Sequence, residues 1–203
     1  MWATRKESVW IAVCLCTFVG VIEMHAMWAD PAPRSQSNGG LKDWPCGAGL
    51  TDVFEDVPTT TLSPGVQTVL FTETIAHTGS PYRIAFTYES DTRYDSYVLF
   101  DHIPHNEVGA TPKVHAVNVT IPNVACTAEA RCALQLIQVM TDKFTEPCPP
   151  SELPNSCGQI GFAYFSCANV IIDGDIPPSS LDPFYASYLG GGPSPYRPGE
   201  VGE

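Results

Sequence analysis

The composition of this 203-residue chain describes an acidic protein with enough apolar residues for a hydrophobic core. Apolar residues make up 44% and charged residues 16% of the chain, as in a globular domain and unlike an intrinsically disordered one. A net charge of −12 at pH 7 cannot neutralise phosphates in bulk, so we expect neither nucleic-acid binding nor docking on anionic lipid.

The first 24 residues have the composition of an export signal. A basic start is followed by an apolar stretch over 9–22 that is too short for a membrane span. We therefore predict a signal peptide over 1–24, a mature chain that begins at His25, and a secreted, extracellular protein without a membrane association. Signal peptidase prefers small residues before the cut, so cleavage after Ala26 or Ala29 remains an alternative.

The chain after the predicted signal alternates in hydrophobicity with the two-residue period of β-strands. Strands are expected over five runs, which are 69–77, 82–88, 114–121, 133–140 and 161–172. Helical periodicity is nearly absent, and eight cysteines and nineteen prolines favour a loop-rich β fold. The pattern predicts an all-β domain, an immunoglobulin- or fibronectin-like antiparallel β-sandwich with long loops and disulfides.

The composition changes after residue 173. Glycine and proline become frequent, and few apolar residues have alternating partners. This composition is typical of disordered linkers. We therefore predict a folded domain over 25–173 and a disordered tail over 174–203.

Six cysteines follow the predicted signal, an even set that is typical of a disulfide framework. The sequence contains no CxxC pair of the kind found in zinc sites, and an oxidising compartment favours disulfides. The spacing predicts the pairs Cys126–Cys132, Cys148–Cys157 and, by elimination, Cys46–Cys167. The last pair closes the longest loop, which removes the most entropy from the unfolded chain.

One tripeptide of the chain is a glycosylation acceptor. It begins at Asn118 and reads Asn-Val-Thr. Asn118 falls on the presumed outward face of a strand, so we expect it to be exposed.

Five histidines are the candidates for metal binding: His25, His77, His102, His105 and His115. No GxSxG serine, His-Glu-x-x-His or phosphate-binding glycine loop occurs, so the sequence has no anchor for triad or zinc hydrolysis. His102 and His105, in the segment Asp-His-Ile-Pro-His-Asn, would form either a second metal site or a solvated loop.

A histidine at the N-terminus has a property that the others lack. Its α-amino group and its ring Nδ1 can bind one metal ion together, and a second imidazole would complete a set of three nitrogens. Nitrogen donors in a tetragonal arrangement favour copper, and an amine with a pKa of about 8 is readily deprotonated by Cu(II). If the mature chain begins at His25, the sequence therefore predicts one copper ion.

Several short motifs follow one another in the order found in one family of secreted copper proteins. They are His25-Ala-Met-Trp-Ala-Asp-Pro-Ala-Pro-Arg34, Pro45-Cys46-Gly47, Ile75-Ala-His77-Thr-Gly79, Cys132-Ala-Leu-Gln-Leu136 and Phe162-Ala-Tyr-Phe-Ser-Cys-Ala-Asn-Val170. Together they resemble lytic polysaccharide monooxygenases, in particular the chitin-active, chitin-binding kind. The resemblance covers most of residues 25–172.

The resemblance implies a copper centre and an oxidative reaction. His25 would supply its amine and Nδ1, and His77 would supply Nε2. Tyr164 would lie beside the copper at the axial position, and Gln135 or Gln138 would be the polar group that steers the oxygen species. With an external electron donor, a monomer of this kind would cleave a neutral polysaccharide such as chitin by oxidation at C1 or C4.

Two positions depart from the family pattern, because Asn169 replaces an Asp and Ile75 replaces a small residue before His77. The aromatic candidates for sugar stacking, some of which could instead fill the core, are Trp28, Trp44, Tyr82, Tyr94 and Tyr97.

Two other functions agree with the same residues. One is a non-catalytic copper protein for uptake or storage, built on the same histidines. The other is a glycan-binding surface module whose histidines bind no metal.

Overall fold

The structure of the protein is a computed structural model that describes residues 25–35, 41–77, 80–105, 111–152, 157, 161–186 and 194–199. The predicted signal peptide lies outside the described residues. The strands are β1 (Ala26–Asp30), β2 (Thr59–Leu62), β3 (Gly65–Glu73), β4 (Tyr82–Tyr88), β5 (Tyr97–Ile103), β6 (Lys113–Ile121), β7 (Ala125–Cys126), β8 (Cys132–Val139), β9 (Ala163–Asp173) and β10 (Phe184–Tyr185). Short 3-10 turns lie at η1 (Tyr94–Ser96), η2 (Thr141–Lys143) and η3 (Pro178–Ser180).

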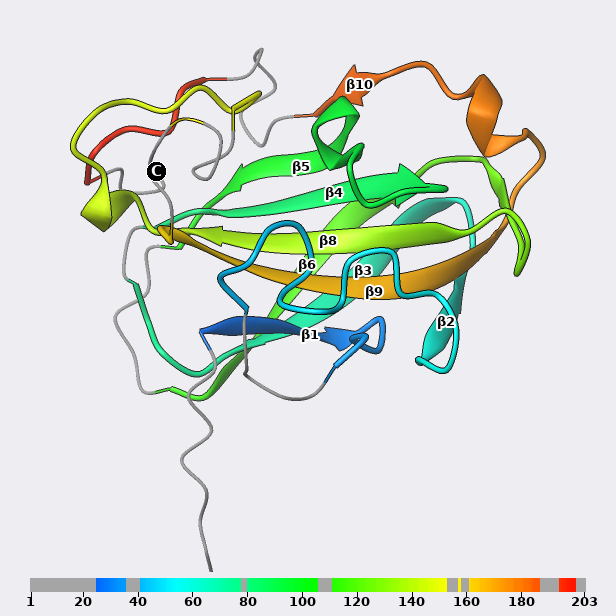
Figure 1. Cartoon of the computed structure of the whole chain (residues 1–203), viewed down its shortest axis with the longest axis horizontal. Helices are drawn as coiled ribbons and strands as arrows, with labels where there is room; N and C mark the ends of the chain where they lie inside the picture. The colour runs from blue at the N-terminus through cyan, green and yellow to red at the C-terminus, as the bar shows by residue number, and fades with distance from the viewer. Residues whose placement is uncertain are drawn as a thin grey trace, which may run out of the picture.

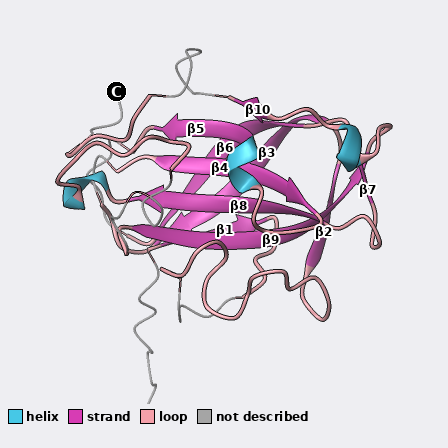
Figure 2. Cartoon of the chain, turned by 45° about the horizontal axis from the view of Figure 1, so that its top comes forward, coloured by secondary structure: helices cyan, strands magenta, loops and turns pink. Residues whose placement is uncertain are grey.

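The strands form two sheets. The smaller sheet has the order β1-β3-β6, and the larger has the order β10-β5-β4-β8-β9-β2, with β7 paired to β9. Figure 1 shows β3 and β6 crossing behind the larger sheet, and Figure 2 shows the same two layers from a tilted view. The predicted all-β sandwich is confirmed. The two edge strands β2 and β10 are parallel to their neighbours, whereas the other pairs are antiparallel.

The predicted strands correspond closely to β4, β6, β8 and β9, but the first expected run is displaced. Strand β3 ends at Glu73, so Ile75 and His77 lie in the segment that follows it. The Thr74 N–H still donates to the His25 carbonyl, which continues the register with β1, but β6 begins only at Lys113, the residue opposite Glu73, so the pairing on that side ends there. Strand β5 has no counterpart among the predicted runs.

The core lies between the sheets and is rich in aromatic side chains. Its largest members include Trp28, Phe71, Tyr82, Phe86, Tyr97, Ile121 and Leu134. Four of the five residues considered for sugar stacking, namely Trp28, Tyr82, Tyr94 and Tyr97, are buried, and Trp44 is half-buried. The stacking role is therefore wrong for these four residues, which stabilise the fold by apolar burial.

All three predicted disulfides, Cys46–Cys167, Cys126–Cys132 and Cys148–Cys157, are confirmed. The first joins residues 121 positions apart and ties the loop before β2 to strand β9. Trp44, Leu50 and Phe54 of that loop pack with Ala85 and Ala133, on the face of the larger sheet that points away from β3 and β6. As a result β4 and β8 are buried on both faces.

Much of the segment expected to be a disordered tail is folded against the domain. Leu181 and Phe184 pack against the core, and β10 pairs with β5. Tyr196 is fully buried, and its backbone pairs with that of Cys148. The prediction of disorder is therefore wrong for 174–186 and 194–199, because a few apolar residues among the glycines and prolines find partners.

Asn118 lies on the exposed face of β6, as the acceptor tripeptide requires. Its Oδ1 accepts a hydrogen bond from the Thr68 hydroxyl at 2.8 Å. Glycosylation of Asn118 stays a prediction. Within the described ranges, no helix is long and apolar enough to cross a membrane.

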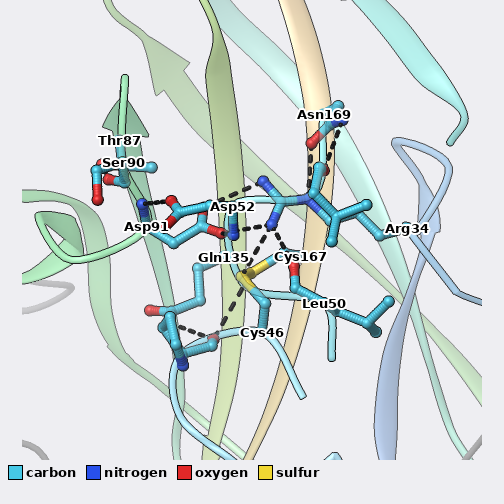
Figure 3. Close-up of polar contacts among 12 residues, drawn as sticks. Arg34, Cys46, Leu50, Asp52, Thr87, Ser90, Asp91, Gln135, Cys167 and Asn169 are labelled. Carbon is cyan, nitrogen blue, oxygen red and sulfur yellow. Dashed lines mark hydrogen bonds and ion pairs between the residues drawn. A yellow bond between two sulfur atoms is a disulfide. The ribbon is translucent and has the colours of Figure 1, made fainter. Parts of the chain in front are cut away.

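A buried arginine joins the N-terminal segment to the larger sheet (Figure 3). The Arg34 guanidinium makes a two-pronged contact with the Asp91 carboxylate at 2.6 and 3.1 Å, and its Nε donates to Asn169 Oδ1 at 2.7 Å. It also donates to the Leu50 carbonyl at 2.8 Å, and its charge lies 4.7 Å from the centre of the Phe54 ring. Both charged side chains are completely buried, so each depends on the other for compensation.

We predict that Asp91→Asn destabilises the protein by about 3–5 kcal/mol, because it leaves the buried Arg34 guanidinium without a counter-charge. Urea denaturation would measure the loss. The matched control is Glu55→Gln, which removes a carboxylate from the exposed pair with Arg131 and should cost less than about 1 kcal/mol. Equal losses of stability from the two substitutions would contradict a stabilising role of the buried ion pair between Arg34 and Asp91.

Candidate metal centre

Strand β1 positions His25, the residue immediately before it. The His25 carbonyl accepts the Thr74 N–H at 3.1 Å, and Ala26 lies opposite Glu73 in the register of β1 and β3. The Trp28 N–H donates to the Ser166 hydroxyl at 3.2 Å, which ties β1 to β9 as well. His25 therefore lies beside both the segment that follows β3 and the start of β9.

These two neighbours supply His77 and Tyr164. The ring centres of His25 and His77 are 5.1 Å apart with nearly parallel planes. The Tyr164 ring stacks on the His25 ring at 3.7 Å. Three residues predicted from motifs far apart in the chain thus form one cluster.

The hydrogen bonds leave a specific nitrogen available on each imidazole. His25 Nε2 lies 2.8 Å from the Tyr164 hydroxyl, which leaves Nδ1 as the other ring nitrogen. His77 Nδ1 lies 3.6 Å from Asp142 Oδ1. His77 Nε2 is buried and has no hydrogen-bond partner among the described residues. A buried nitrogen without a partner is costly unless a ligand uses it.

The surroundings of both imidazoles favour their neutral, metal-binding form. Burial, followed by the nearby His77 and Lys42, lowers the pKa of His25 to about 4. Burial also lowers the pKa of His77, although the Asp142 carboxylate acts in the opposite direction. Neutral imidazoles are the form that binds transition metals, so the donor set of this cluster fits a copper ion near neutral pH.

The two glutamines proposed as the steering group lie in different places. Gln138 is opposite Tyr164 in the register of β8 and β9, and its amide donates to Glu73 Oε1 at 3.4 Å. Gln135 donates to the Pro45 carbonyl at 2.7 Å and lies opposite Cys167. Because side chains alternate along a strand, Gln135 points to the other face of the sheet. The structure therefore brings Gln138 close to the cluster and excludes Gln135 from it.

Asn169, one departure from the family pattern, contacts Arg34 and the Val53 carbonyl and has no contact with the histidine cluster. Conversely, three charged residues near the histidines were not predicted from the sequence. Asp142 faces His77, Lys42 lies 5.1 Å from the centre of the Tyr164 ring, and Glu73 contacts His105 and His115. No local motif marks these residues, since each reaches its partner only through the fold.

The segment with His102 and His105, for which the sequence left open a second metal site or a solvated loop, is neither, because both side chains are buried and have different partners. The His102 ring stacks on Tyr196 at 4.6 Å and its Nε2 lies 3.2 Å from the Ser194 hydroxyl. His105 instead lies beside Glu73 and His115, whose ligand atoms together with its own fall within 4.8 Å of one another.

Comparisons with known proteins add little to this geometry. No family model and no curated protein matches the chain. A lytic polysaccharide monooxygenase important for efficient utilization of chitin in Cellvibrio japonicus has a TM-score of 0.36 and 17% identity, with 57% of this chain and 56% of that chain covered. A lytic polysaccharide monooxygenase from Kitasatospora papulosa has a TM-score of 0.33 and 11% identity, with 58% and 52% covered. The match thus spans about half of each solved chain, and at these values it assigns no function to this one.

We predict that the His25 ring of the metal-free protein titrates with a midpoint near pH 4, against about 6.5 for an unperturbed histidine. Because the folded pKa lies below the unfolded one, the unfolded chain binds more protons between these values. The contribution of His25 to stability is therefore complete above about pH 6.5 and is lost as the pH falls towards 4. Histidine ring NMR signals followed against pH would measure the midpoint, and a value near 6.5 would contradict the burial of this ring.

Proposed function

We propose that this chain is a secreted copper protein of the lytic polysaccharide monooxygenase type, in which His25 and His77 hold one copper ion. The observation that carries the proposal is the pairing of these two half-buried imidazoles at 5.1 Å, with His77 Nε2 lacking a partner among the described residues. The three disulfides support export to an oxidising compartment.

The residues around the pair would have distinct roles. Cleavage before His25 would free its amine, so that this amine and Nδ1 bind the ion together with His77 Nε2. Copper in such a site supplies one-electron redox chemistry toward oxygen.

The remaining contacts orient the ligands. With Nδ1 used as a ligand, Nε2 of His25 carries the proton and donates it to the Tyr164 oxygen at 2.8 Å. The Asp142 carboxylate, 3.6 Å from Nδ1 of His77, orients that ring in the same way. Gln138, held by Glu73, would be the polar group nearest the site.

The substrate class follows from charge and from the family resemblance. A chain with a net charge of −12 repels polyanionic polymers, so a neutral glycan such as chitin is the proposed substrate. An external donor would supply the electrons. A monomer is sufficient for this chemistry, since His25, His77 and Tyr164 belong to one chain.

A second candidate function, a copper carrier built on the same histidines, is favoured by one observation. Four of the five aromatic residues considered for sugar stacking are buried in the fold. The carrier would bind copper as tightly as the enzyme but would not release products from a polysaccharide.

We predict that His77→Ala lowers the copper affinity of the secreted protein by more than about 100-fold, because it removes one of three nitrogen donors. Calorimetric titration with Cu(II) and the cupric EPR spectrum would measure this loss. The matched control is His102→Asn, which removes a histidine outside the cluster at a positive φ of 52° that asparagine tolerates. An unchanged affinity in His77→Ala would refute the ligand role, and an intact mass that begins after residue 25 would refute the terminal amine.

We predict further that the copper-loaded wild-type protein releases oxidised oligosaccharides from chitin only when a reductant is present. Mass spectrometry of the soluble products would identify them, and the His77→Ala protein serves as the inactive control. Tight copper binding without any product from chitin or related neutral glycans would favour the carrier over the enzyme.

A further inference from the structure

We propose that Glu73, His105 and His115 form a second metal site, separate from the His25–His77 pair, that binds one divalent cation of the zinc class. Its ligands come from three places in the fold: the end of β3, the segment after β5, and strand β6. The site does not depend on cleavage of the signal or on copper, since its donors are all side chains.

The three donors already lie close to the spacing that a metal ion requires. Glu73 Oε1 is 3.0 Å from His105 Nε2, and Glu73 Oε2 is 3.1 Å from His115 Nε2. In a tetrahedral zinc site with metal–ligand bonds of about 2.0–2.2 Å, neighbouring ligands lie roughly 3.3–3.5 Å apart. All three ligand atoms lie within 4.8 Å of one another, so side-chain movements of about an ångström would place them around one ion.

The protonation of His105 points to a cation at this position. Its Nδ1 lies 2.9 Å from the His77 carbonyl, which can only accept, so Nδ1 carries a proton. In the neutral ring Nε2 then has a lone pair, and that lone pair faces the Glu73 carboxylate. Two lone pairs at this distance repel unless a proton or a metal ion lies between them. A ring that donates one N–H to a backbone carbonyl and offers the other nitrogen is typical of a metal-bound histidine.

Glu73 and His105 do not form a solvated cluster of charges, because both side chains are buried. Glu73 is 1% exposed and His105 is 2% exposed. In the metal-free protein, with a proton on Nε2 of each ring in place of the ion, burial raises the pKa of Glu73, but the hydrogen bonds that His105 and His115 then donate outweigh this effect and lower the pKa to about 2. The carboxylate is thus ionised at neutral pH in a place where charges need close compensation.

The surrounding side chains complete the site. The Gln138 amide donates to Glu73 Oε1 at 3.4 Å, while its own Oε1 is buried and has no partner within the described part of the chain. The Phe71 ring stacks on His115 at 4.9 Å, and the Tyr82 ring lies 5.2 Å from that of His105. These rings limit the access of solvent to the ligands on their side of the cluster.

The ligand count indicates how the ion would be held. Two imidazoles and one carboxylate are the set used at zinc sites that keep a fourth position for water. His115, with 14% of its side chain exposed, is the ligand through which solvent reaches the cluster. Because His105 also binds the His77 carbonyl, the ion would hold in place the segment that carries His77.

The test uses the secreted His77→Ala protein, which retains the His77 backbone carbonyl but lacks the copper site. After chelator treatment and dialysis against Zn²⁺, elemental analysis should find one zinc per chain, and Co²⁺ in its place should give the visible absorption of a four-coordinate site. Zinc should also raise the melting temperature of this protein.

Adding Glu73→Gln or His115→Ala should remove the bound zinc and lower the affinity by more than about 100-fold. The added control substitutions Glu55→Gln and His102→Asn should leave zinc binding unchanged. Absence of zinc in the folded His77→Ala protein, or full zinc binding in both ligand variants, would overturn the proposal and leave a protonated His105 as the partner of Glu73. If Glu73→Gln fails to fold, the zinc stoichiometry of His115→Ala, at the more exposed ligand, decides the matter. The copper titration of the wild-type protein is separate, so failure of one site is distinguishable from failure of the other.

Discussion

The buried contact between Arg34 and Asp91 is the constraint on which the histidine cluster depends. Strand β1 has only five residues and lies at the edge of the smaller sheet, so its own hydrogen bonds hold it weakly. Arg34 fastens the chain just beyond β1 to the loop before β2, to Asp91 and to strand β9. The disulfide Cys46–Cys167 secures the same loop to β9. Because Arg34 holds the chain beyond β1 and the disulfide holds the loop before β2, β1 stays in place and His25 stays beside the end of β3.

The end of β3 is the point where the two histidine sets meet. Glu73 is the last residue of the strand and contacts His105 and His115. Thr74 binds the His25 carbonyl, and His77 follows three residues later. The end of β3 therefore carries Glu73 toward one pair of histidines, and the segment that follows carries His77 toward His25. Burial then keeps the His25 and His77 rings neutral, since a charged ring there would lose its hydration.

Local patterns of the sequence predict part of this fold correctly. The two-residue period predicts β4, β6, β8 and β9, and the cysteine spacing predicts all three disulfides. The same patterns do not separate exposed aromatic residues from buried ones, because alternation identifies a strand but does not show which of its faces another layer covers. The composition of the tail predicts disorder, but Tyr196 is buried there despite the abundant glycine and proline. The sequence does not distinguish Gln135 from Gln138 as the steering group. The structure does, because their side chains lie on opposite faces of β8 and have different partners.

The fold class and the cysteine pairs can be derived from the sequence alone, and the motif order selects His25, His77 and Tyr164 as candidates, because strand period, spacing and motif order are local properties of the chain. The surroundings of these residues, by contrast, are visible only in the folded chain. Glu73 meets His105 and His115 across 32 and 42 positions, and Asp142 reaches His77 from the turn after β8. Such contacts follow from strand register and sheet packing, which bring together residues that no short-range pattern links.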